Sequence, residues 1–282
     1  MKLASYVHAG VAGYGVVVGD GIVDLSRRIG ARYPDLRALL AADALEAARA
    51  ASAAAAPDFA LSAVWLQPVI PNPRKILCIG LNYDEHRKEG GHASTEAPAV
   101  FVRFAESQVG HGEAILRPRE SQQFDYEGEI ALVIGKGGRR IAEADAWAHI
   151  AGYSCYNDGS VRDWQHATSQ WTAGKNFVAT GAFGPWMVSA DEIAPGSVLT
   201  LSTRLNGVQM QHSSTDFLIH PIPRLIAYLS TWTPLAPGDV IVTGTPGGVG
   251  ARRKPPVWMQ PGDLVEVEVD RIGVLRNPIA AD

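Results

Sequence analysis

The stretch Glu127-Gly128-Glu129-Ile130-Ala131-Leu132-Val133-Ile134-Gly135 decides how this chain is read. Its apolar part, 130–134, predicts a buried strand. On a strand, side chains two positions apart point to the same face, so Glu127 and Glu129 are aimed at one place beside an apolar core. Two carboxylates that close repel each other, and either a proton or a cation has to relieve the conflict.

A third carboxylate follows the next strand-like run, 150–157, at Asp158. A strand end can present one more ligand to a neighbouring strand, and hard divalent cations prefer several oxygen ligands. The sequence therefore predicts a metal site formed by Glu127, Glu129 and Asp158. The alternative is that both glutamates lie on the solvent face of a half-buried strand. The apolar continuation argues against this alternative, because a solvent face keeps alternating.

The composition is that of an ordinary globular protein. The chain has 282 residues, of which 46% are hydrophobic and 19% are charged, with a net charge of -4. Neither a nucleic-acid partner nor a membrane is expected, because no basic surface and no apolar stretch of ~20 residues is present. No signal-peptide pattern is found, and Cys78 and Cys155 read as small buried side chains. A cytoplasmic, reducing location is therefore predicted.

A change of pattern near residue 70 predicts two domains. Residues 1–70 combine short strands, glycine turns and an alanine- and leucine-rich helical segment at 35–56, and they are expected to form a small α/β N-terminal domain. Three prolines then form an extended connector, at Pro68, Pro71 and Pro73. Residues 71–282 are expected to form the larger domain.

The larger part is expected to be rich in strands, with few helices. Strands are predicted at 75–80, 99–104, 129–134, 149–157, 199–205, 208–212, 239–243 and 264–270. Helices are predicted at 83–89, 143–149, 160–166 and 221–230. Leu205-Asn206-Gly207-Val208 indicates a two-residue hairpin. This order does not alternate strand and helix, so it predicts a β-rich α+β fold.

The helical segment after the strand 75–80 carries His86 and Glu89. They are three positions apart and so share one helical face. A carboxylate beside an imidazole orients the ring and raises its basicity, which makes His86 a candidate general base. The open alternative is a solvated, charged helix.

Two cations follow Asp158 along the chain. Arg162, with Gln165 one helical turn later, is a candidate to bind a substrate carboxylate, although a surface ion pair with Asp158 is an alternative. Lys175 lies among Gly, Asn and aromatic residues and is a candidate to stabilise an oxyanion or enolate.

A glycine-rich segment, Thr243-Gly244-Thr245-Pro246-Gly247-Gly248-Val249-Gly250, permits close approach of the backbone to a ligand. Thr245 adds a hydroxyl or N–H donor, and turn chemistry alone is the alternative explanation. The segment is neither a phosphate loop nor a dinucleotide fingerprint, which disfavours phosphoryl transfer. The histidines other than His86, namely His8, His92, His111, His149, His166, His212 and His220, lack metal-ligand spacing and read as structural or surface residues.

Taken in order, these elements resemble the fumarylacetoacetate hydrolase family over about residues 74–277. The motifs that carry the resemblance are Gly80-Leu81-Asn82-Tyr83 with His86 and Glu89, Tyr126-Glu127-Gly128-Glu129, Asp158 with Arg162, Asp163 and Gln165, Gly174-Lys175, and the glycine-rich segment. The resemblance implies a β-roll-like fold for the larger domain, a homodimer, and Mg²⁺, Mn²⁺ or Ca²⁺ as cofactor. It also implies a small 2-oxo or 2,4-dioxo carboxylic acid as substrate.

The resemblance also implies a role for each candidate residue. Glu127, Glu129 and Asp158 match metal ligands. His86 and Glu89 match a catalytic dyad on a lid, here 83–98 with a hinge at Gly90-Gly91. Lys175 matches the lysine near the scissile carbonyl, and Arg162, Gln165 and Thr245 match substrate contacts. Asn82 is placed near a further aspartate ligand of some members, and Leu81 departs from members that carry arginine there.

The reaction that this resemblance implies is hydrolysis of a C–C bond in a 2,4-dioxo acid, with His86 and Glu89 activating water. The alternatives within the family are an oxo-acid isomerase, such as a 2-hydroxymuconate-type isomerase, a decarboxylase, such as one for oxaloacetate, and a dehydratase. A non-catalytic binding protein is a further alternative. Phe177, Phe183 and Trp186 are the aromatic residues expected near the site, where they would contact the rest of the substrate.

Overall fold

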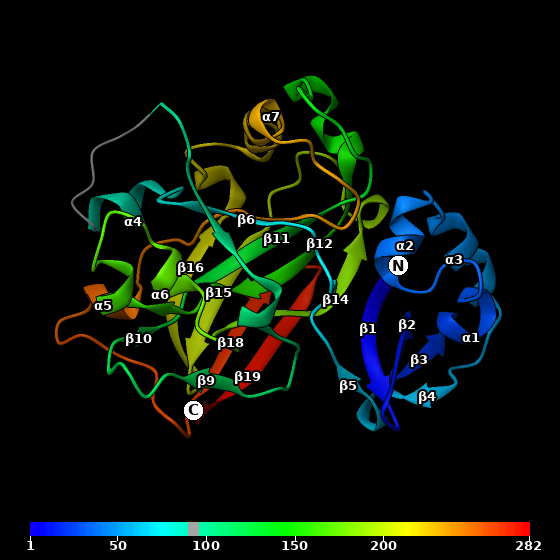
Figure 1. The fold of residues 1–282 in the computed structure, drawn as a ribbon, viewed down its shortest axis with the longest axis horizontal. Helices are drawn as coiled ribbons and strands as arrows, with labels where there is room; N and C mark the ends of the chain where they lie inside the picture. Colours follow the sequence, from blue (N-terminus) through cyan, green and yellow to red (C-terminus); the bar gives the residue numbers. More distant parts are fainter. Residues whose placement is uncertain (90–95) are drawn as a thin grey trace.

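The computed structural model describes residues 1–89 and 96–282 and shows an α+β fold rich in strands, as predicted (Figure 1). Within these residues, twelve strands form one large sheet, whose main path runs β4-β3-β2-β1-β14-β12-β11-β17-β6-β7. The strands are β1 (Lys2–His8), β2 (Val11–Val18), β3 (Gly21–Asp24), β4 (Phe59–Ala60), β5 (Trp65–Leu66), β6 (Ile76–Gly80), β7 (Ala99–Arg103), β8 (Gln108–Val109), β11 (Gly128–Ile134), β12 (Ile150–Asn157), β14 (Gly181–Ser189) and β17 (Val240–Val242).

Two smaller sheets complete the strand layers. One has the order β16-β15-β18-β19-β9, and the other pairs β10 with β13. Their strands are β9 (Ile115–Arg117), β10 (Phe124–Asp125), β13 (Ser160–Val161), β15 (Thr200–Leu205), β16 (Val208–Ser214), β18 (Leu264–Val269) and β19 (Gly273–Ala281). The predicted hairpin joins β15 to β16, with positive φ at both Asn206 and Gly207 as a type I′ turn requires.

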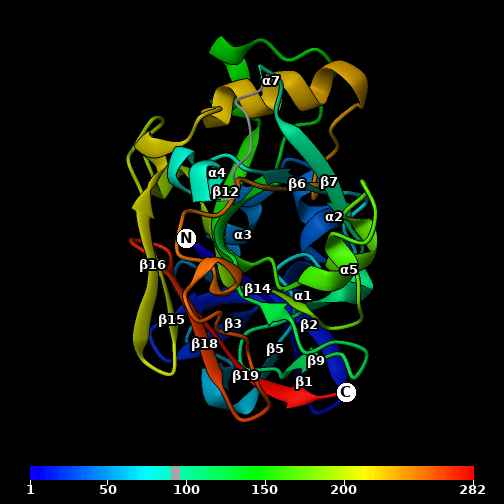
Figure 2. The same cartoon turned by 90° about the vertical axis from the view of Figure 1, so that its left-hand side faces the viewer.

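The helices are short and lie outside the sheets. They are α1 (Leu25–Ile29), α2 (Leu36–Ala41), α3 (Leu45–Ser52), α4 (Asp84–Glu89), α5 (Arg162–Gln165), α6 (Thr172–Lys175) and α7 (Ile222–Trp232). The 3-10 turns are η1 (Leu61–Ala63), η2 (Ala105–Ser107), η3 (Glu143–His149), η4 (Ala190–Glu192), η5 (Thr215–Phe217) and η6 (Gly250–Arg252). Helices α1 to α3 lie beside the N-terminal strands, whereas α7 lies apart from them at the top of both views (Figures 1 and 2). No helix in the described ranges is long and apolar enough to cross a membrane.

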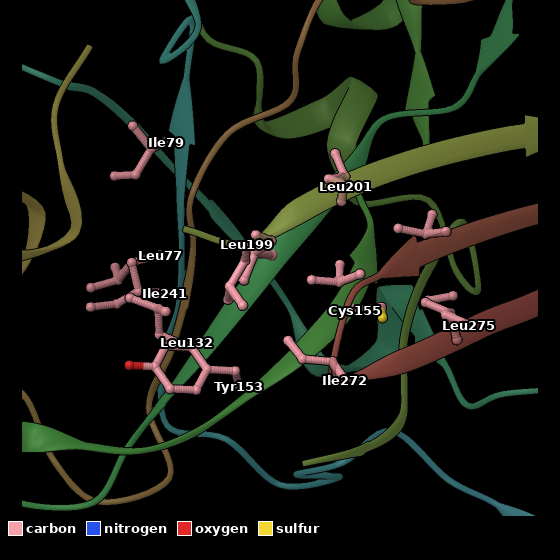
Figure 3. Close-up of a cluster of buried hydrophobic side chains, with 14 of the residues drawn as sticks. Leu77, Ile79, Leu132, Tyr153, Cys155, Leu199, Leu201, Ile241, Ile272 and Leu275 are labelled. Atoms are coloured by element: carbon pink, nitrogen blue, oxygen red, sulfur yellow. The ribbon is translucent and has the colours of Figure 1, made fainter. Parts of the chain in front are cut away.

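Strand β11 is buried along its whole length because both of its faces are covered. Its residues Ile130, Leu132 and Ile134 belong to a core shared with the five-stranded sheet. The alternate residues Ala131 and Val133 belong to a second core, which includes leucines of α1 and α2. Figure 3 shows the first core, a single cluster that includes Leu132 and Tyr153 from the large sheet and Leu201 and Leu275 from the five-stranded sheet. Burial of each such side chain contributes about 1.5–3 kcal/mol.

The differences from the predicted elements have local causes. The segment 35–56, which is expected to form one or two helices, forms two, whereas segment 143–149 is a 3-10 helix and segment 160–166 begins as β13 before it turns into α5. Strands β14 and β19 are not predicted, because Gly184-Pro185 and Pro278 interrupt the usual strand pattern. Cys78 and Cys155 are free and buried, as expected.

The N-terminal strands continue the large sheet rather than forming a sheet of their own. Strand β1 pairs with β14 through Lys2↔Val188 and Leu3↔Met187. Hydrogen bonds therefore link segments on both sides of residue 70. The division into domains 1–70 and 71–282 stays a prediction.

Candidate active site and metal centre

Three buried carboxylates meet where β11 and β12 lie side by side. Glu129 is on β11, Glu127 lies one residue before it, and Asp158 directly follows β12. One carboxylate oxygen from each lies within 4.8 Å of the others. The antiparallel register produces this meeting, because Gly128 pairs with Asn157 and the Asp158 N–H donates to the Glu127 carbonyl at 2.8 Å.

This cluster has too much negative charge for its buried position. Burial raises the pKa of Glu129 well above its usual range, and the neighbouring Asp158 and Glu127 raise it further. A group in this state keeps a proton unless a cation takes its place. Three hard oxygen donors at this spacing suit a divalent cation such as Mg²⁺ or Mn²⁺, so Glu127, Glu129 and Asp158 are the residues that would hold it.

Lys175, at the end of α6, contacts two of these carboxylates. Its Nζ lies 2.8 Å from Glu127 Oε2 and 2.6 Å from Asp158 Oδ2. Burial alone would lower the pKa of this lysine, but Asp158 and Glu127 more than offset it and raise the pKa above its usual value. Lys175 is therefore a buried ammonium beside the carboxylate oxygens of Glu127 and Asp158, where it can also stabilise negative charge on a substrate oxygen.

Arg162 reaches the cluster from the other side. Its Nη1 lies 2.6 Å from Glu127 Oε1 and also donates to Gln165 Oε1 at 2.9 Å. Burial raises the pKa of Glu127, but Lys175 and Arg162 outweigh it, so this carboxyl has a pKa well below its usual range. The alternative of a surface ion pair between Arg162 and Asp158 is wrong, because Arg162 is buried and its acidic partners are Glu127 and Asp125.

Two residues of this network are not identified from the sequence. Asp125, at the end of β10, accepts a hydrogen bond from Arg162 Nε at 2.9 Å. Arg103, the last residue of β7, forms a buried ion pair with Asp158 and also donates to Thr180. The signal for Asp125 is its spacing of two residues before Glu127, which repeats the spacing from Glu127 to Glu129. Arg103 has no local signal, because β7 comes far ahead of Asp158 in the chain.

The glycine-rich segment binds the protein's own carboxylates. Gly244 N–H donates to Glu129 at 2.5 Å, Gly248 N–H to Glu89 at 3.1 Å, and Gly250 N–H to Asp125 at 2.8 Å. The close backbone approach that the glycines permit is thus present, but with side chains of this chain as partners.

Thr245 supports the same region from within the glycine-rich segment. Its hydroxyl donates to the Gly128 carbonyl at 2.9 Å and accepts from Gln211 Nε2 at 2.8 Å. Gln211 Oε1 in turn accepts the Gly128 N–H at 3.0 Å. Both backbone groups of the glycine between the two glutamates are therefore fixed, which holds Glu127 and Glu129 in place.

His86, on α4, lines the cavity next to the cluster. Among the described residues, its Nδ1 has no hydrogen-bond partner. Burial lowers the pKa of His86 to about 4. Glu127 acts in the opposite direction, whereas the nearby Arg162 and Lys175 lower the pKa further. The imidazole is therefore neutral at ordinary pH and able to accept a proton.

Glu89 does not contact His86 through any hydrogen bond in the described ranges, because its carboxylate accepts from Gly248 instead. The hinge Gly90-Gly91 and His92 lie outside the described residues. Asn82 uses its whole amide on the backbone: Nδ2 donates to the Thr243 and His220 carbonyls and Oδ1 accepts the His220 N–H. It therefore braces the loops beside the site, and it is not among the described residues grouped around the candidate metal site, which are Glu127, Glu129 and Asp158.

A cavity of about 260 Å³ opens onto the cluster. It is lined by seven of the predicted site residues: Glu127, Glu129, Lys175, Arg162, His86, Gln165 and Thr245. The other two, Asp158 and Glu89, do not line it. Its aromatic lining comes from Phe101, Trp171 and Trp258. The expectation for Phe177, Phe183 and Trp186 is wrong, because none of them lines this cavity. His166 does line it, although the sequence assigns it no role.

Comparison with known proteins gives one family and several relatives. Residues 75–280 match the model of the fumarylacetoacetate (FAA) hydrolase C-terminal family. A Xenopus laevis protein named oxaloacetate tautomerase fahd2, mitochondrial, is 43% identical over 220 residues, which cover 77% of this chain and 69% of that protein.

Solved structures agree with this result. A putative HpcE protein from Mycobacterium smegmatis has a TM-score of 0.89 and 35% identity, and the match covers 100% of this chain and 99% of that one. Maleylpyruvate hydrolase from Sphingobium sp. SYK-6, solved with manganese(II) and pyruvate, has a TM-score of 0.83 and 28% identity, with coverage of 100% and 99%.

Proposed function

Because the chain belongs to the fumarylacetoacetate hydrolase family, we propose that it interconverts the keto and enol forms of a small 2-oxo acid of the oxaloacetate type. The observation that carries the proposal is the cavity that Glu127, Glu129, Lys175 and His86 line together. Tautomerisation requires one base that removes a proton next to the carbonyl and one group that stabilises the resulting negative oxygen. The similarity to oxaloacetate tautomerase supports the same reaction.

We further propose Mg²⁺ as the cation that Glu127, Glu129 and Asp158 hold, with Mn²⁺ or Ca²⁺ as substitutes. The manganese(II) in the related maleylpyruvate hydrolase structure supports a divalent ion. When bound, such a cation supplies Lewis-acid polarisation of the carboxylate and 2-oxo oxygens of a substrate.

The protein's own groups supply the remaining steps. Neutral His86 takes the proton from the carbon next to the 2-oxo group, and the protonated ring returns it to the oxygen to give the enol. The ammonium of Lys175 stabilises negative charge on that oxygen. Arg162 fixes Glu127 through the 2.6 Å contact, and Thr245 fixes the backbone of Gly128. Gln165 holds Arg162 and faces the cavity.

Hydrolysis of a C–C bond in a 2,4-dioxo acid is the second candidate. The likeness to maleylpyruvate hydrolase favours it. Hydrolysis needs a base strong enough to activate water, and the resemblance assigns this role to His86, oriented by Glu89. In the described residues Glu89 is engaged by the Gly248 N–H, so hydrolysis requires that this contact is exchanged for one with His86. Tautomerisation needs no such exchange and is therefore the first proposal.

The two candidates differ in their products. The purified protein with Mg²⁺ or Mn²⁺ would be mixed with freshly dissolved enol-oxaloacetate, and the enol absorbance and the mass of the products would be followed. Faster loss of the enol signal without a change in mass is expected for a tautomerase. Pyruvate with CO₂ would indicate a decarboxylase.

The same assay with a panel of acylpyruvates tests hydrolysis, which releases pyruvate and a second acid. A chelator and the double variant Glu127→Gln/Glu129→Gln are the controls, and both should abolish the reaction. An undiminished rate in the double variant with chelator present would remove the metal from the proposal. The homodimer and the cytoplasmic location stay predictions, which light scattering and cell fractionation would check.

A further inference from the structure

The cations that line the cavity are not used equally. Arg162 is paired with Asp125 and Glu127, and Lys175 is paired with Glu127 and Asp158. Arg252, the last residue of η6, lines the same cavity but has no ion pair and no side-chain hydrogen bond to any of the described residues. Of the arginines and lysine that line the cavity, Arg252 is therefore the one whose charge is not neutralised by a carboxylate of the described residues.

The backbone that carries Arg252 is fixed relative to the metal centre. The N–H groups of Gly250 and Ala251 both donate to Asp125, at 2.8 and 3.0 Å. Asp125 in turn binds Arg162, which contacts Glu127. The backbone position of Arg252 is therefore set by contacts that lead through Asp125 and Arg162 to the carboxylate cluster, while Arg252 itself is exposed.

The apolar part of the cavity wall makes this free cation significant. Phe101, Trp171 and Trp258 contribute aromatic surface, against which a bare carboxylate loses hydration without compensation. A guanidinium restores that loss through charge-assisted and often bidentate hydrogen bonds. A substrate with an anion only at its 2-oxo acid end would leave Arg252 unused.

We propose that Arg252 binds the second carboxylate of a 2-oxo dicarboxylic acid whose other end lies at Glu127, Glu129 and Asp158, and so selects dicarboxylates over monocarboxylates. This inference rests on the proposed function and deepens it, because it names the substrate class and the residue that reads it. Arg252 is a specificity residue and takes no part in proton transfer.

Equilibrium binding tests the inference with a readout other than the reaction rate. The Mn²⁺-loaded protein would be titrated calorimetrically with oxaloacetate and with pyruvate, which share the 2-oxo acid end and differ in the second carboxylate. Arg252→Gln should weaken oxaloacetate binding by roughly tenfold or more and leave pyruvate binding within about twofold. Arg252→Lys should recover part of the loss, since it keeps the charge without the planar fork.

Lys254→Gln is the matched control. Lys254 is exposed in the same loop, two residues on, and does not line the cavity. The substitution Lys254→Gln removes the same charge from the same loop but outside the cavity, so it should leave the affinities for oxaloacetate and for pyruvate unchanged. Equal weakening of both ligands by Arg252→Gln, or no weakening of either, would overturn the inference. Wild-type protein that binds pyruvate and oxaloacetate equally would overturn it as well.

These outcomes are distinguishable from failure of the proposed function. If wild-type protein neither binds oxaloacetate nor accelerates its tautomerisation, the proposed function is wrong and the role of Arg252 with it. If wild-type protein binds and converts oxaloacetate but Arg252→Gln behaves as wild type, only the inference about Arg252 is wrong.

Discussion

The ammonium nitrogen of Lys175 lies 2.6 Å from Asp158 Oδ2, which joins the end of α6 to the end of β12 inside the protein. The same nitrogen reaches Glu127 at 2.8 Å. Together with Arg103 and Arg162, it offsets three of the four carboxylates of this network, which are Asp125, Glu127, Glu129 and Asp158. One excess negative charge remains. Glu129 has the raised pKa, so we expect a proton or a metal ion to neutralise this charge at Glu129.

Substitution Lys175→Met should make the metal-free protein unstable. Methionine keeps much of the volume, but Glu127 and Asp158 lose their shared cation, and breaking such a buried contact typically costs about 3–5 kcal/mol. Denaturant unfolding in chelator should show this loss, and saturating Mn²⁺ should recover more stability in the variant than in wild type. Lys136→Met is the surface control. Equal stability of Lys175→Met and wild type in chelator would contradict the ion-pair account.

Substitution Asp125→Asn should act on the metal site through Arg162. The amide keeps one acceptor oxygen and can replace only one of the two carboxylate oxygens, of which one accepts from Gly250 and the other from Ala251 and Arg162. The negative charge opposite the guanidinium is also lost, so Arg162 should bind Glu127 more strongly. We expect Mn²⁺ affinity to fall by about tenfold, which corresponds to about 1.4 kcal/mol. A Mn²⁺ titration followed by electron paramagnetic resonance measures this.

Asp163→Asn is the control for that experiment. Asp163 lies next to Arg162 in α5 and accepts a hydrogen bond from the Ser121 hydroxyl at 2.6 Å, away from the carboxylate cluster. Its substitution should leave the Mn²⁺ affinity unchanged. If both variants lose affinity equally, the effect comes from α5 as a whole and not from the contact between Asp125 and Arg162.

The sequence predicts the strand-rich class and the residues of the carboxylate cluster because both depend on local patterns. Continuous apolar runs mark β11 and β12, and the two-residue spacing of the glutamates marks their shared direction. The partners that neutralise the cluster are harder to find. Arg103 and Asp158 are 55 positions apart, and β11, β17 and β6 lie between β12 and β7 in the sheet order, so neither the sequence nor strand pairing indicates their contact.

The aromatic wall shows the same limit. Phe177 and Phe183 lie near Lys175 in the sequence, but Phe183 belongs to β14 and faces the second core. Phe101, on β7, and Trp171, directly before α6, line the cavity instead. Proximity to Lys175 along the chain therefore does not separate Trp171 from Phe177 and Phe183, and it misses Phe101 altogether.

The acidic side of the pH profile should depend on His86. Its pKa is lowered from 6.5 to about 4, so the ring stays neutral and able to accept a proton at pH values well below 6.5. With saturating Mn²⁺, kcat/KM should therefore stay flat from neutral pH to about pH 5 and fall only below it. His86→Gln should reduce kcat by about 10²–10⁴-fold, as loss of a general base does, and keep Mn²⁺ binding.

The same lowered pKa makes folding stability depend on pH. The unfolded chain binds a proton at His86 near pH 6.5, whereas the folded chain does so only near pH 4, so stability from this group is lost as pH falls between these values. Denaturation of His86→Gln and wild type at pH 7 and pH 5 measures this, and the variant should lose less stability on acidification. A wild-type kcat/KM profile that falls with a midpoint near pH 6.5 would show that His86 is not the kinetic base or is not desolvated.

Substitution Gly128→Ala should disturb the spacing between Glu127 and Glu129. An added Cβ would lie 1.9 Å from Thr203 Oγ1 and 3.2 Å from Thr203 Cβ, so the main obstacle is one side-chain oxygen of β15. Overpacking of this kind costs about 1–3 kcal/mol. Thr203→Ala removes that oxygen, which has no hydrogen-bond partner among the described residues, so the single Thr203 variant should be tolerated. The double variant Gly128→Ala/Thr203→Ala should recover much of the stability and Mn²⁺ affinity that Gly128→Ala loses. Additive losses in the double-mutant cycle would show that the glycine is needed for its backbone conformation and not for the space beside Thr203.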